Sequence, residues 1–331
     1  MKAIIPVAGI GSRLRPHTHT QPKALVPVAG KPILGHIVDH LIASGLNDFV
    51  FIVGYLGDKI EQYLLKQYPN LNCEFVMQTS GKGIGHAIVL AKDHVKMQEP
   101  VLIVLGDTIF EAQLDDVFNA SCSMLGVKKV EDPRSFGVAE MNAEHVITRL
   151  VEKPAIPKSN LALIGVYFIR ETQMLFDALA FNVENEIKTQ NEFHLTDALM
   201  RMIEQGVSFK TFDVENWFDC GKKEILLQTN ALLLKRKKQP ELKPNQVEKS
   251  IIIPPVYIGE NARIVHSVIG PNVSVGDHTV IRSSIISDSI IGPYAQISSA
   301  VLKETVIGND ASLKGMVYRL NLGDSAEMDF G

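Results

Sequence analysis

The sequence predicts two parts: an α/β domain with a mostly parallel sheet, followed by a short left-handed β-helix. Up to about residue 235, short apolar runs alternate with segments of helical periodicity. Strands separated by helices favour parallel pairing in a sheet that carries helices on its faces. After residue 250 an aliphatic residue recurs every five or six positions, often beside glycine, which is the repeat of a β-helix.

The strands and helices of the first part follow one another in a regular order. The strands are unbroken apolar runs, as expected for a sheet that is covered on both faces. Ligands of such sheets bind beyond the carboxyl ends of the strands, and Gly9, Gly106 and Asp107 fall at these ends. We expect strands at residues 2–7, 49–53, 73–77 and 101–105, and helices at residues 32–44, 58–68 and 85–95.

The β-helix prediction depends on a series of evenly spaced aliphatic residues. About 60 residues with this repeat give roughly three to four coils. Some acyltransferases with the same repeat use a histidine, and His266 and His278 lie here. A β-helix this short nevertheless favours a structural or oligomer-forming role. The aliphatic positions are Ile258, Ile264, Ile269, Val275, Ile281, Ile286, Ile291, Ile297 and Ile307.

A basic, proline-containing stretch marks the boundary between the two parts. We predict a catalytic domain at residues 1–238, a linker at 239–250, and the β-helix with a C-terminal tail at 251–331. The last residues, 321–331, are expected to form a cap or an arm. The cluster at 235–238 could bind phosphate or nucleic acid, but a solvated helix C-terminus is the better interpretation, because the helix dipole favours cations there.

Composition and charge exclude several classes of protein. The net charge of −4 gives no support for nucleic-acid binding, which usually shows as a basic excess. The three cysteines form neither a disulfide framework nor a CxxC metal site, so a reducing compartment fits best. No apolar stretch has the length of a membrane span or of a signal-peptide core. We therefore expect a cytoplasmic protein with no nucleic-acid or membrane partner.

The loop after the first strand has the character of a phosphate site. Residues 9–13 read Gly-Ile-Gly-Ser-Arg, and a glycine turn after a strand leaves backbone N–H groups that can point at an anion. Arg13 and Lys23 supply the charges that a polyphosphate needs. The P-loop pattern is absent, and Leu14 stands where a dinucleotide fingerprint needs its third glycine. These residues predict binding of a nucleoside triphosphate.

Together with Pro22 and Lys23, this loop resembles that of the sugar-1-phosphate nucleotidylyltransferases. The resemblance extends from Met1 to at least Ile307 and is nearest to the long glucose-1-phosphate thymidylyltransferases. It implies a Rossmann-like nucleotidyltransferase sandwich followed by the β-helix. It also implies transfer of a nucleotidyl group from a pyrimidine triphosphate to glucose-1-phosphate, with release of pyrophosphate. Residues 5–9 and 83–87 resemble UTP-using enzymes instead, so dTTP is only favoured over UTP.

The resemblance implies that five charged residues bind the reacting phosphates and the metal ion. The attacking sugar-phosphate oxygen is already anionic, so this chemistry needs positioning and charge neutralisation more than a protein nucleophile. The resemblance implies that Arg13 and Lys23 bind the β- and γ-phosphates, that Lys153 orients the sugar phosphate, and that Asp107 and Asp219 hold Mg²⁺. On its own, Asp107 could equally be a turn or helix-cap residue. Cys220 stands where the family usually has threonine.

The remaining binding residues divide into a nucleotide set and a sugar-phosphate set. A glutamine can pair with the imide edge of uracil or thymine, because its amide both donates and accepts. We expect Thr196 and Asp197 to cap a helix, Glu192 to lie near the sugar, and His194 and His86 to be structural. The nucleotide set is Ala8, Gly9, Gly11, Ser12, Gln78, Gly83 and Gly85. The sugar-phosphate set is Gly137, Glu152, Lys153, Gly165 and Tyr167.

Two other functions stay open. A non-catalytic regulatory paralogue would keep the fold, but such paralogues typically lose the lysine or the metal carboxylates, and here all five charged residues are present. A bifunctional enzyme with an acyltransferase β-helix would need more coils than this chain has. A homo-oligomer is expected, while the sugar and the size of the oligomer cannot be read from these residues.

Overall fold

The computed structural model describes residues 1–237, 243 and 245–316. The predicted linker lies partly, and the predicted tail at 321–331 wholly, outside these residues. The chain forms two compact units, which we describe separately. Unit 1 comprises Met1–Pro27 and Lys31–Leu226, and unit 2 comprises Val28–Gly30 and Leu227–Gly331.

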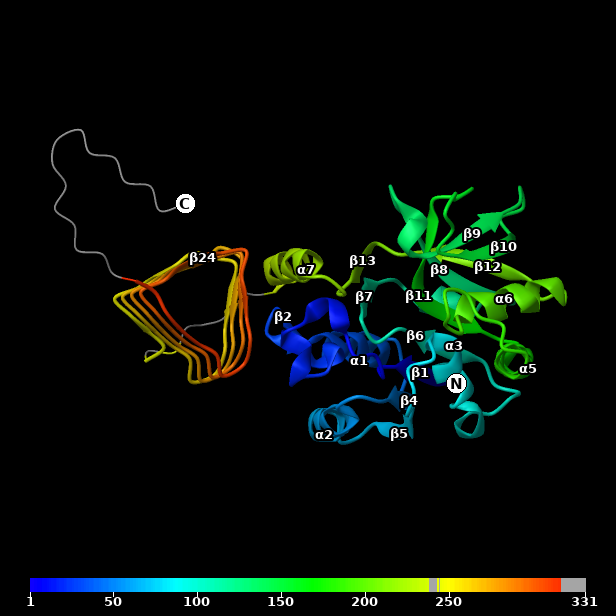
Figure 1. Cartoon of the computed structure of the whole chain (residues 1–331), viewed down its shortest axis with the longest axis horizontal. Helices are drawn as coiled ribbons and strands as arrows, with labels where there is room; N and C mark the ends of the chain where they lie inside the picture. The colour runs from blue at the N-terminus through cyan, green and yellow to red at the C-terminus, as the bar shows by residue number, and fades with distance from the viewer. Residues whose placement is uncertain (238–242, 244, 317–331) are drawn as a thin grey trace. The chain divides into compact units, whose positions relative to one another are not determined.

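Unit 1 is built on one mixed sheet of nine strands (Figure 1). Its parallel part is β6 (Val101–Val104), β1 (Lys2–Pro6), β4 (Asp48–Val53) and β5 (Asn72–Met77), in that spatial order. Beyond β6 follow β11 (Leu161–Ile169), β8 (Ser123–Lys129), β9 (Gly137–Met141), β10 (Ile147–Glu152) and β12 (Phe209–Asp213), in which β11 runs antiparallel to its neighbours and β12 parallel to β8. The α/β architecture predicted from the sequence is confirmed.

The helices pack against this sheet and enclose its core. They are α1 (Ile33–Ala43), α2 (Gly57–Gln67), α3 (Ile84–Val89), α4 (Asp115–Phe118), α5 (Thr172–Glu184) and α6 (Leu195–Glu204), whereas α7 (Lys223–Arg236) begins in unit 1 and continues into unit 2. Phe49 and Phe51 of β4 are completely buried, as the apolar run predicts. No helix among the described residues is long and apolar enough to cross a membrane. The smaller strands are β2 (Pro27–Val28), β3 (Lys31–Pro32), β7 (Thr108–Glu111) and β13 (Asn216–Asp219).

One helix is shorter than expected. The sequence predicts a helix at residues 85–95, but α3 ends at Val89 and a separate 3₁₀ turn follows at Lys92–His94. The N–H of Leu90 donates to the carbonyl of Ala87, three residues back, and such bonds tighten the last turn and end the α-helix.

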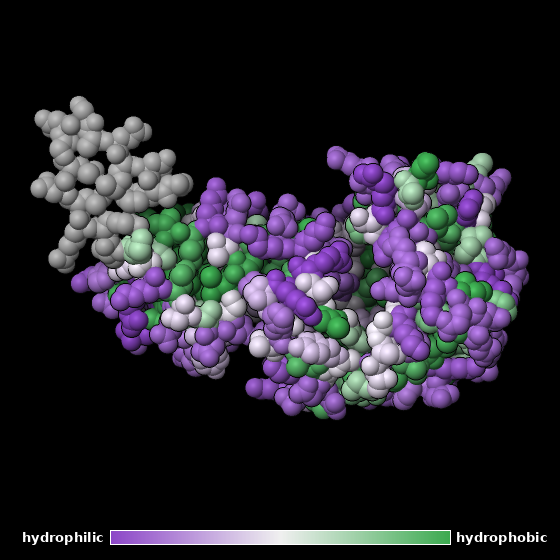
Figure 2. Space-filling view, viewed as in Figure 1, coloured by the Kyte–Doolittle hydropathy of each residue, from purple (hydrophilic) through white to green (hydrophobic). Residues whose placement is uncertain are grey.

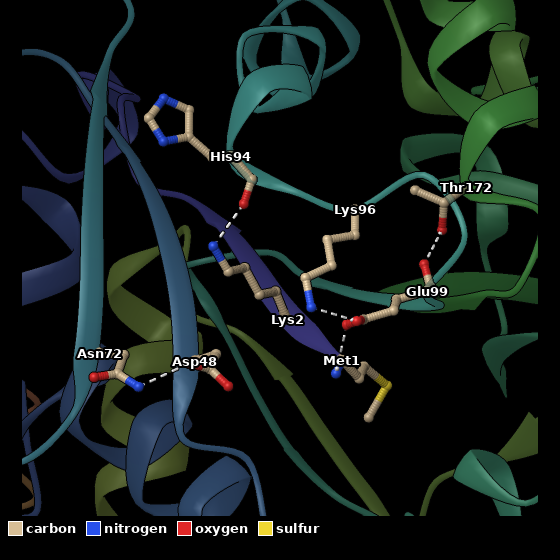
Figure 3. Close-up of polar contacts among 8 residues, drawn as sticks. All are labelled: Met1, Lys2, Asp48, Asn72, His94, Lys96, Glu99 and Thr172. Carbon is tan, nitrogen blue, oxygen red and sulfur yellow. Dashed lines mark hydrogen bonds and ion pairs between the residues drawn. The ribbon is translucent and has the colours of Figure 1, made fainter.

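The amino ends of the parallel strands carry a cluster of mutually satisfied polar groups (Figure 3). Lys2 donates to the carbonyl of His94 at 2.6 Å, and the Met1 amino group lies 3.4 Å from Glu99. The Thr172 hydroxyl donates to the carbonyl of Glu99 at 2.6 Å. Because these groups are satisfied within the protein, this edge of the sheet is structural, and the opposite edge is the one that can receive ligands.

Unit 2 contains the left-handed β-helix that the repeat predicts. Each coil contributes a strand to three parallel sheets, and the aliphatic residues of successive coils stack inside, with Ile264, Ile281 and Ile286 fully buried. The first sheet is β14 (Val247–Glu248), β17 (Arg263–Val265), β20 (Val280–Arg282), β23 (Gln296–Ser298) and β26 (Ser312–Lys314). The second is β15 (Ile251–Ile252), β18 (Val268–Ile269), β21 (Ile285–Ser287) and β24 (Val301–Lys303). The third is β16 (Val256–Ile258), β19 (Val273–Val275), β22 (Ile290–Ile291) and β25 (Val306–Ile307).

The third sheet of the β-helix is covered from outside. The Ser274 hydroxyl donates to Oδ1 of Asn230 on α7 at 2.6 Å, and Nδ2 of Asn230 donates to the carbonyl of Asn272 at 3.0 Å. Gly30 lies so close to Tyr257 that a Cβ would sit 2.5 Å from the ring. Residues 28–30 and α7 therefore form one body with the β-helix.

The other two sheets differ in the side chains that point outward. The first sheet exposes charged residues such as Arg263 and Arg282, whereas the second sheet exposes aliphatic side chains. Figure 2 shows hydrophobic residues at the surface of the β-helix. Residues Ile251, Val268, Ile285 and Val301 lie in register on adjacent strands, and Ile251, Ile285 and Val301 are 62, 52 and 78% exposed.

Candidate active site

The glycine loop after β1 folds against Lys23. Gly11 has a φ of +68°, in the left-handed region that favours glycine, and its carbonyl accepts a 2.8 Å hydrogen bond from the Thr18 hydroxyl. A Cβ on Gly11 would lie 2.8 Å from Cβ of Lys23, whereas a Cβ on Gly9 would meet nothing within 4 Å. Gly11 therefore shapes the loop, and the space beside Gly9 is open to a ligand.

The two other predicted nucleotide-binding residues of this loop are Ala8 and Ser12. Ala8 packs against Gly54 at the end of β4, where a Cβ on Gly54 would lie 2.9 Å from that of Ala8. Ser12 begins a short 3₁₀ helix, Ser12–Leu14, and its carbonyl accepts from the N–H of Arg15. The loop thus brings Arg13 to the carboxyl end of β1.

Two aspartates come together beside this loop. A Cβ on Gly106 would lie 2.2 Å from Val7, so glycine is needed for the turn after β6 to approach the end of β1. Asp107 follows in this turn and is succeeded by strand β7, so the helix-cap interpretation is wrong. Asp219 ends β13, whose antiparallel pairing places it opposite Thr108, and the N–H of Cys220 donates to the carbonyl of Asp107 at 3.1 Å.

Lys23 is the cation that both aspartates share. Its Nζ contacts Oδ2 of Asp107 directly and lies 4.0 Å from Oδ1 of Asp219, and the lysine side chain is only 12% exposed. The guanidinium of Arg13 borders the same place, because a Cβ on Gly221 would lie 3.0 Å from both Arg13 Nη2 and Asp219 Oδ1. Two cations and two carboxylates thus form one cluster at the carboxyl edge of the sheet.

The two carboxyl groups differ in acidity. Burial alone would raise the pKa of Asp107, but Lys23, a backbone hydrogen bond and Arg13 together outweigh it and hold that pKa below its ordinary value. Burial and the neighbouring charge of Asp107 raise the pKa of Asp219. The described residues contain no cluster of three or more metal-ligating side chains, so a cation here would take its other ligands from water or from a bound phosphate.

A second cluster surrounds Glu152 at the end of β10. Oε2 of Glu152 accepts a 2.7 Å hydrogen bond from the Thr196 hydroxyl, and Oε1 lies 3.5 Å from Nδ1 of His194 and 3.7 Å from Nζ of Lys153. Lys153 has a φ of +42°, which is rare outside glycine, and its N–H donates to the carbonyl of Phe136 at 3.0 Å. Strained backbone held in place by such contacts is frequent at functional sites.

The remaining residues of the predicted sugar-phosphate set are Gly137, Gly165 and Tyr167. Each affects either Glu152 or the segment that precedes Asp107. A Cβ on Gly137 would lie 3.0 Å from the Thr196 hydroxyl and 3.2 Å from Oε2 of Glu152, so glycine leaves room for that hydrogen bond. Gly165 has a φ of +86°, and its carbonyl accepts from the N–H of Leu105 at 2.9 Å. Tyr167 is buried, and burial together with the charge of Glu152 raises the pKa of its hydroxyl.

The hydroxyl of Tyr167 lies in the electrostatic field of both clusters. Burial raises its pKa most, and the charges of Glu152 and Asp107 raise it further. Figure 2 shows the surface of unit 1 hollowed between the region of β7 and β13 and the region of β8 and β11. The cluster around Lys23 and the Glu152 cluster are thus the two polar parts of the candidate site.

The predicted base-reading residues form the next part of the site. Nε2 of Gln78 donates to the carbonyl of Gly83 at 3.2 Å and lies 3.0 Å from Nδ1 of His86. Gly83 has a φ of +100°, and a Cβ on it would lie 2.6 Å from the carbonyl oxygen of Phe193. The N–H of Gly85 donates to the same oxygen at 2.7 Å. The segment after Gln78 is thus fixed against the segment that precedes α6.

The start of α6 differs from the prediction. The prediction that Thr196 caps this helix is wrong: the N-cap is His194, no side chain caps the helix, and the Thr196 hydroxyl bonds to Glu152 instead. Glu192 lies beside Gly83, where a Cβ on that glycine would be 3.0 Å from the Cβ of Glu192. The only local signal for these contacts was the pair of polar residues Thr196 and Asp197 at the start of α6.

The comparison with known families agrees with this geometry. Residues 2–236 match the family model described as nucleotidyl transferase. The chain belongs to the nucleotidyl transferase family. Residues 241–310 of this nucleotidyl transferase match the model of the GlmU-like C-terminal hexapeptide region. The family resemblance predicted from the glycine loop is confirmed, and so is the prediction of an enzyme.

Individual relatives cover much of this nucleotidyl transferase. The low-salt glycan biosynthesis nucleotidyltransferase Agl11 of Haloferax volcanii is 36% identical over 245 residues, which is 72% of this chain and 67% of that protein. A glucose-1-phosphate thymidylyltransferase of Streptomyces antibioticus is 30% identical over 303 residues, or 89% of this chain and 82% of that protein. The structure of a UDP-glucose pyrophosphorylase complexed with UDP-glucose superposes with a TM-score of 0.63 at 26% identity, covering 71% of this chain and 99% of that one.

Proposed function

We propose that this enzyme transfers a nucleotidyl group from a pyrimidine nucleoside triphosphate, dTTP in preference to UTP, to glucose-1-phosphate. The products are the nucleoside diphosphate glucose and pyrophosphate. The observation that carries the proposal is the position of Lys23 between Asp107 and Asp219, at the sheet edge where the glycine loop ends. The Glu152 cluster supplies a second polar site next to it.

The residues present suit a direct displacement at phosphorus. An oxygen of the sugar phosphate forms the new bond to the α-phosphorus, and the bond from that phosphorus to the oxygen of the leaving pyrophosphate breaks. Arg13 and Lys23 neutralise the triphosphate, Lys153 receives the sugar phosphate, and Glu152 accepts from sugar hydroxyls. Because the nucleophile is already ionised, no protein group has to remove a proton.

Asp107 and Asp219 would hold Mg²⁺ in this reaction. Carboxylate oxygens are the ligands that Mg²⁺ prefers, and protein sites for it commonly supply one or two carboxylates while phosphates and water complete the shell. Burial and, after it, the charge of Asp107 raise the pKa of Asp219, and a divalent cation bound here would offset both effects. When bound, Mg²⁺ supplies neutralisation of phosphate charge.

The contacts of Gln78 support a pyrimidine base. Among the described residues both of its side-chain contacts engage Nε2, so the amide oxygen can accept from the imide N–H of uracil or thymine. Preference for dTTP is supported by the thymidylyltransferase relative, whose similarity covers 89% of this chain.

A competition assay tests the two substrate choices. Equal concentrations of dTTP and UTP are offered with glucose-1-phosphate, mannose-1-phosphate or N-acetylglucosamine-1-phosphate in the presence of Mg²⁺, and the nucleotide sugars are separated. We expect dTDP-glucose to dominate. If UDP-glucose dominates, the proposed preference for dTTP is wrong. If product forms only from mannose-1-phosphate or N-acetylglucosamine-1-phosphate, the proposed choice of glucose-1-phosphate is wrong. A folded protein without any product would favour the non-catalytic paralogue.

Gly9 and Gly11 are expected to respond differently to alanine. Gly9→Ala fills open space without a protein clash, so it should leave the melting temperature unchanged and raise the KM for the triphosphate about tenfold or more. Gly11→Ala forces a side chain into a left-handed conformation against Lys23 and should destabilise the fold by about 1–2 kcal/mol. Thermal melts and steady-state kinetics check both. Equal loss of stability in the two variants would contradict this division of roles.

We further propose that the enzyme is a homo-oligomer joined through the second sheet of the β-helix. That sheet exposes an in-register aliphatic column, whereas the third sheet is covered and the first is charged. Ile285→Lys should lower the mass measured by light scattering to that of one chain, while Gln296→Lys on the charged sheet should not. A wild-type protein that is already monomeric would refute the proposal.

A further inference from the structure

The Glu152 carboxylate has more partners than a sugar-binding residue requires. Its side chain is only 10% exposed, and Thr196 donates to Oε2 at 2.7 Å. Two other groups face Oε1, namely Nδ1 of His194 at 3.5 Å and Nζ of Lys153 at 3.7 Å. A carboxylate this buried needs compensating donors, because an ionised group without them is costly in a protein interior.

The two neighbours of Oε1 differ in freedom. The Lys153 side chain is 34% exposed, and its long flexible stem lets the ammonium turn away from Glu152. The His194 side chain is 6% exposed and cannot leave without opening the packing around it. Under the proposed function, Lys153 binds the sugar phosphate, whose charge draws the ammonium away from Glu152 and leaves Oε1 more dependent on His194.

The backbone around His194 is anchored to the nucleotide side of the site. The N–H of Phe193 donates to the carbonyl of Lys82 at 2.9 Å, and the carbonyl of Phe193 accepts from Gly85. His194 is the residue that follows, at the start of α6. Its imidazole is therefore held in place by contacts that do not involve the sugar site.

The two ring nitrogens of His194 have different surroundings. Its Nε2 is buried and has no partner, and the same holds for Oδ2 of Asp197, so these two atoms do not satisfy each other. Nδ1 is therefore the ring nitrogen of His194 that faces a partner, on the side of Glu152.

We propose that His194 is a positioning residue that keeps Glu152 fixed when Lys153 turns to the sugar phosphate. His194 holds Oε1, Thr196 holds Oε2, and Lys153 is released to the phosphate. The role of Lys153 in this inference rests on the proposed function. The contacts of Glu152 are observed in the structure and do not depend on it.

Two substitutions of His194 test the proposal. His194→Phe keeps a ring but removes both nitrogens, and His194→Asn restores a donor near the position of Nδ1. We expect His194→Phe to raise the KM for glucose-1-phosphate about tenfold and to leave the KM for dTTP within about twofold. His194→Asn should recover most of the loss. Unchanged sugar KM in His194→Phe, equal rises in both KM values, or an asparagine variant as impaired as the phenylalanine variant would each overturn the proposal.

A control substitution far from Glu152 and a structural measurement complete the test. Thr172→Val also removes a buried hydrogen bond, at the opposite edge of the sheet in Figure 3, and should change neither KM. Crystal structures of ligand-free Lys153→Met and of the double variant Lys153→Met/His194→Phe, in which Lys153 no longer contacts Glu152, give a readout that does not need turnover. If the wild type turns over no sugar phosphate, the proposed function fails. Independently, the same single orientation of Glu152 in both variants would overturn the positioning role, whereas a carboxylate displaced only in the double variant would support it.

Discussion

Replacing Lys23 with alanine is expected to lower kcat/KM by about a thousandfold while the protein remains folded. Lys23 contacts Asp107 and lies 4.0 Å from Asp219, so it is the cation nearest to the proposed reacting phosphates. Removing one preorganised donor to charge that develops in a transition state typically costs about a hundred- to a thousandfold. Steady-state kinetics with dTTP and glucose-1-phosphate, together with a thermal melt, give both quantities.

Lys31 provides the matched control for this substitution. It forms an ion pair with Asp39 in the same part of the chain, but both partners are well exposed. An exposed pair contributes about 0–1 kcal/mol to stability, and Lys31 has no contact with the site cluster. Lys31→Ala should therefore retain wild-type kinetics. A Lys23→Ala enzyme with the kinetics of Lys31→Ala would show that the cluster around Asp107 is not the reaction centre.

Gly83→Ala is expected to damage both the stability and the nucleotide site. Gly83 combines a φ of +100° with a ψ of 173°, a backbone region that is essentially restricted to glycine. The added Cβ would also lie 2.6 Å from a backbone oxygen of Phe193, which cannot move away as a flexible side chain could. We expect a loss of about 2–3 kcal/mol in the free energy of unfolding, a melting temperature lower by about 5 °C or more, and a rise of at least about tenfold in the KM for dTTP.

Gly81 is the control for the same loop. A Cβ on Gly81 would meet nothing within 4 Å, and its φ lies outside the left-handed region. Gly81→Ala should therefore melt at the wild-type temperature and bind dTTP normally. If Gly83→Ala also behaves like the wild type, the bonds between the Gln78 segment and Phe193 do not shape the nucleotide site.

The features that the sequence predicts well have local or strictly periodic causes. The β-helix follows from its aliphatic period, because each inward residue must stack on the same position of the next coil. The glycine loop and the turn at Gly106 are visible because glycine is required where backbones approach closely. The length of α3 was overestimated, because apolar periodicity continues past Val89 while the backbone already tightens at Leu90.

The contacts within the site could not be predicted in the same way. Thr196 bonds to Glu152, 44 residues away, and no local pattern distinguishes this hydroxyl from that of a helix cap. Gly137 shows the same limit. Its place in the predicted sugar-phosphate set gave no hint that a Cβ there would intrude on the hydrogen bond between Glu152 and Thr196. Side-chain partners across a fold depend on packing, which single-sequence patterns do not encode.

The most direct test of the proposed reaction is ³¹P NMR of the wild-type enzyme with dTTP, glucose-1-phosphate and Mg²⁺. Direct displacement at the α-phosphorus predicts that signals of dTDP-glucose and pyrophosphate grow in equal amounts, and that neither appears when glucose-1-phosphate is omitted. A folded enzyme that leaves both substrates unchanged, or that releases dTMP and pyrophosphate by hydrolysis, would contradict nucleotidyl transfer to the sugar phosphate.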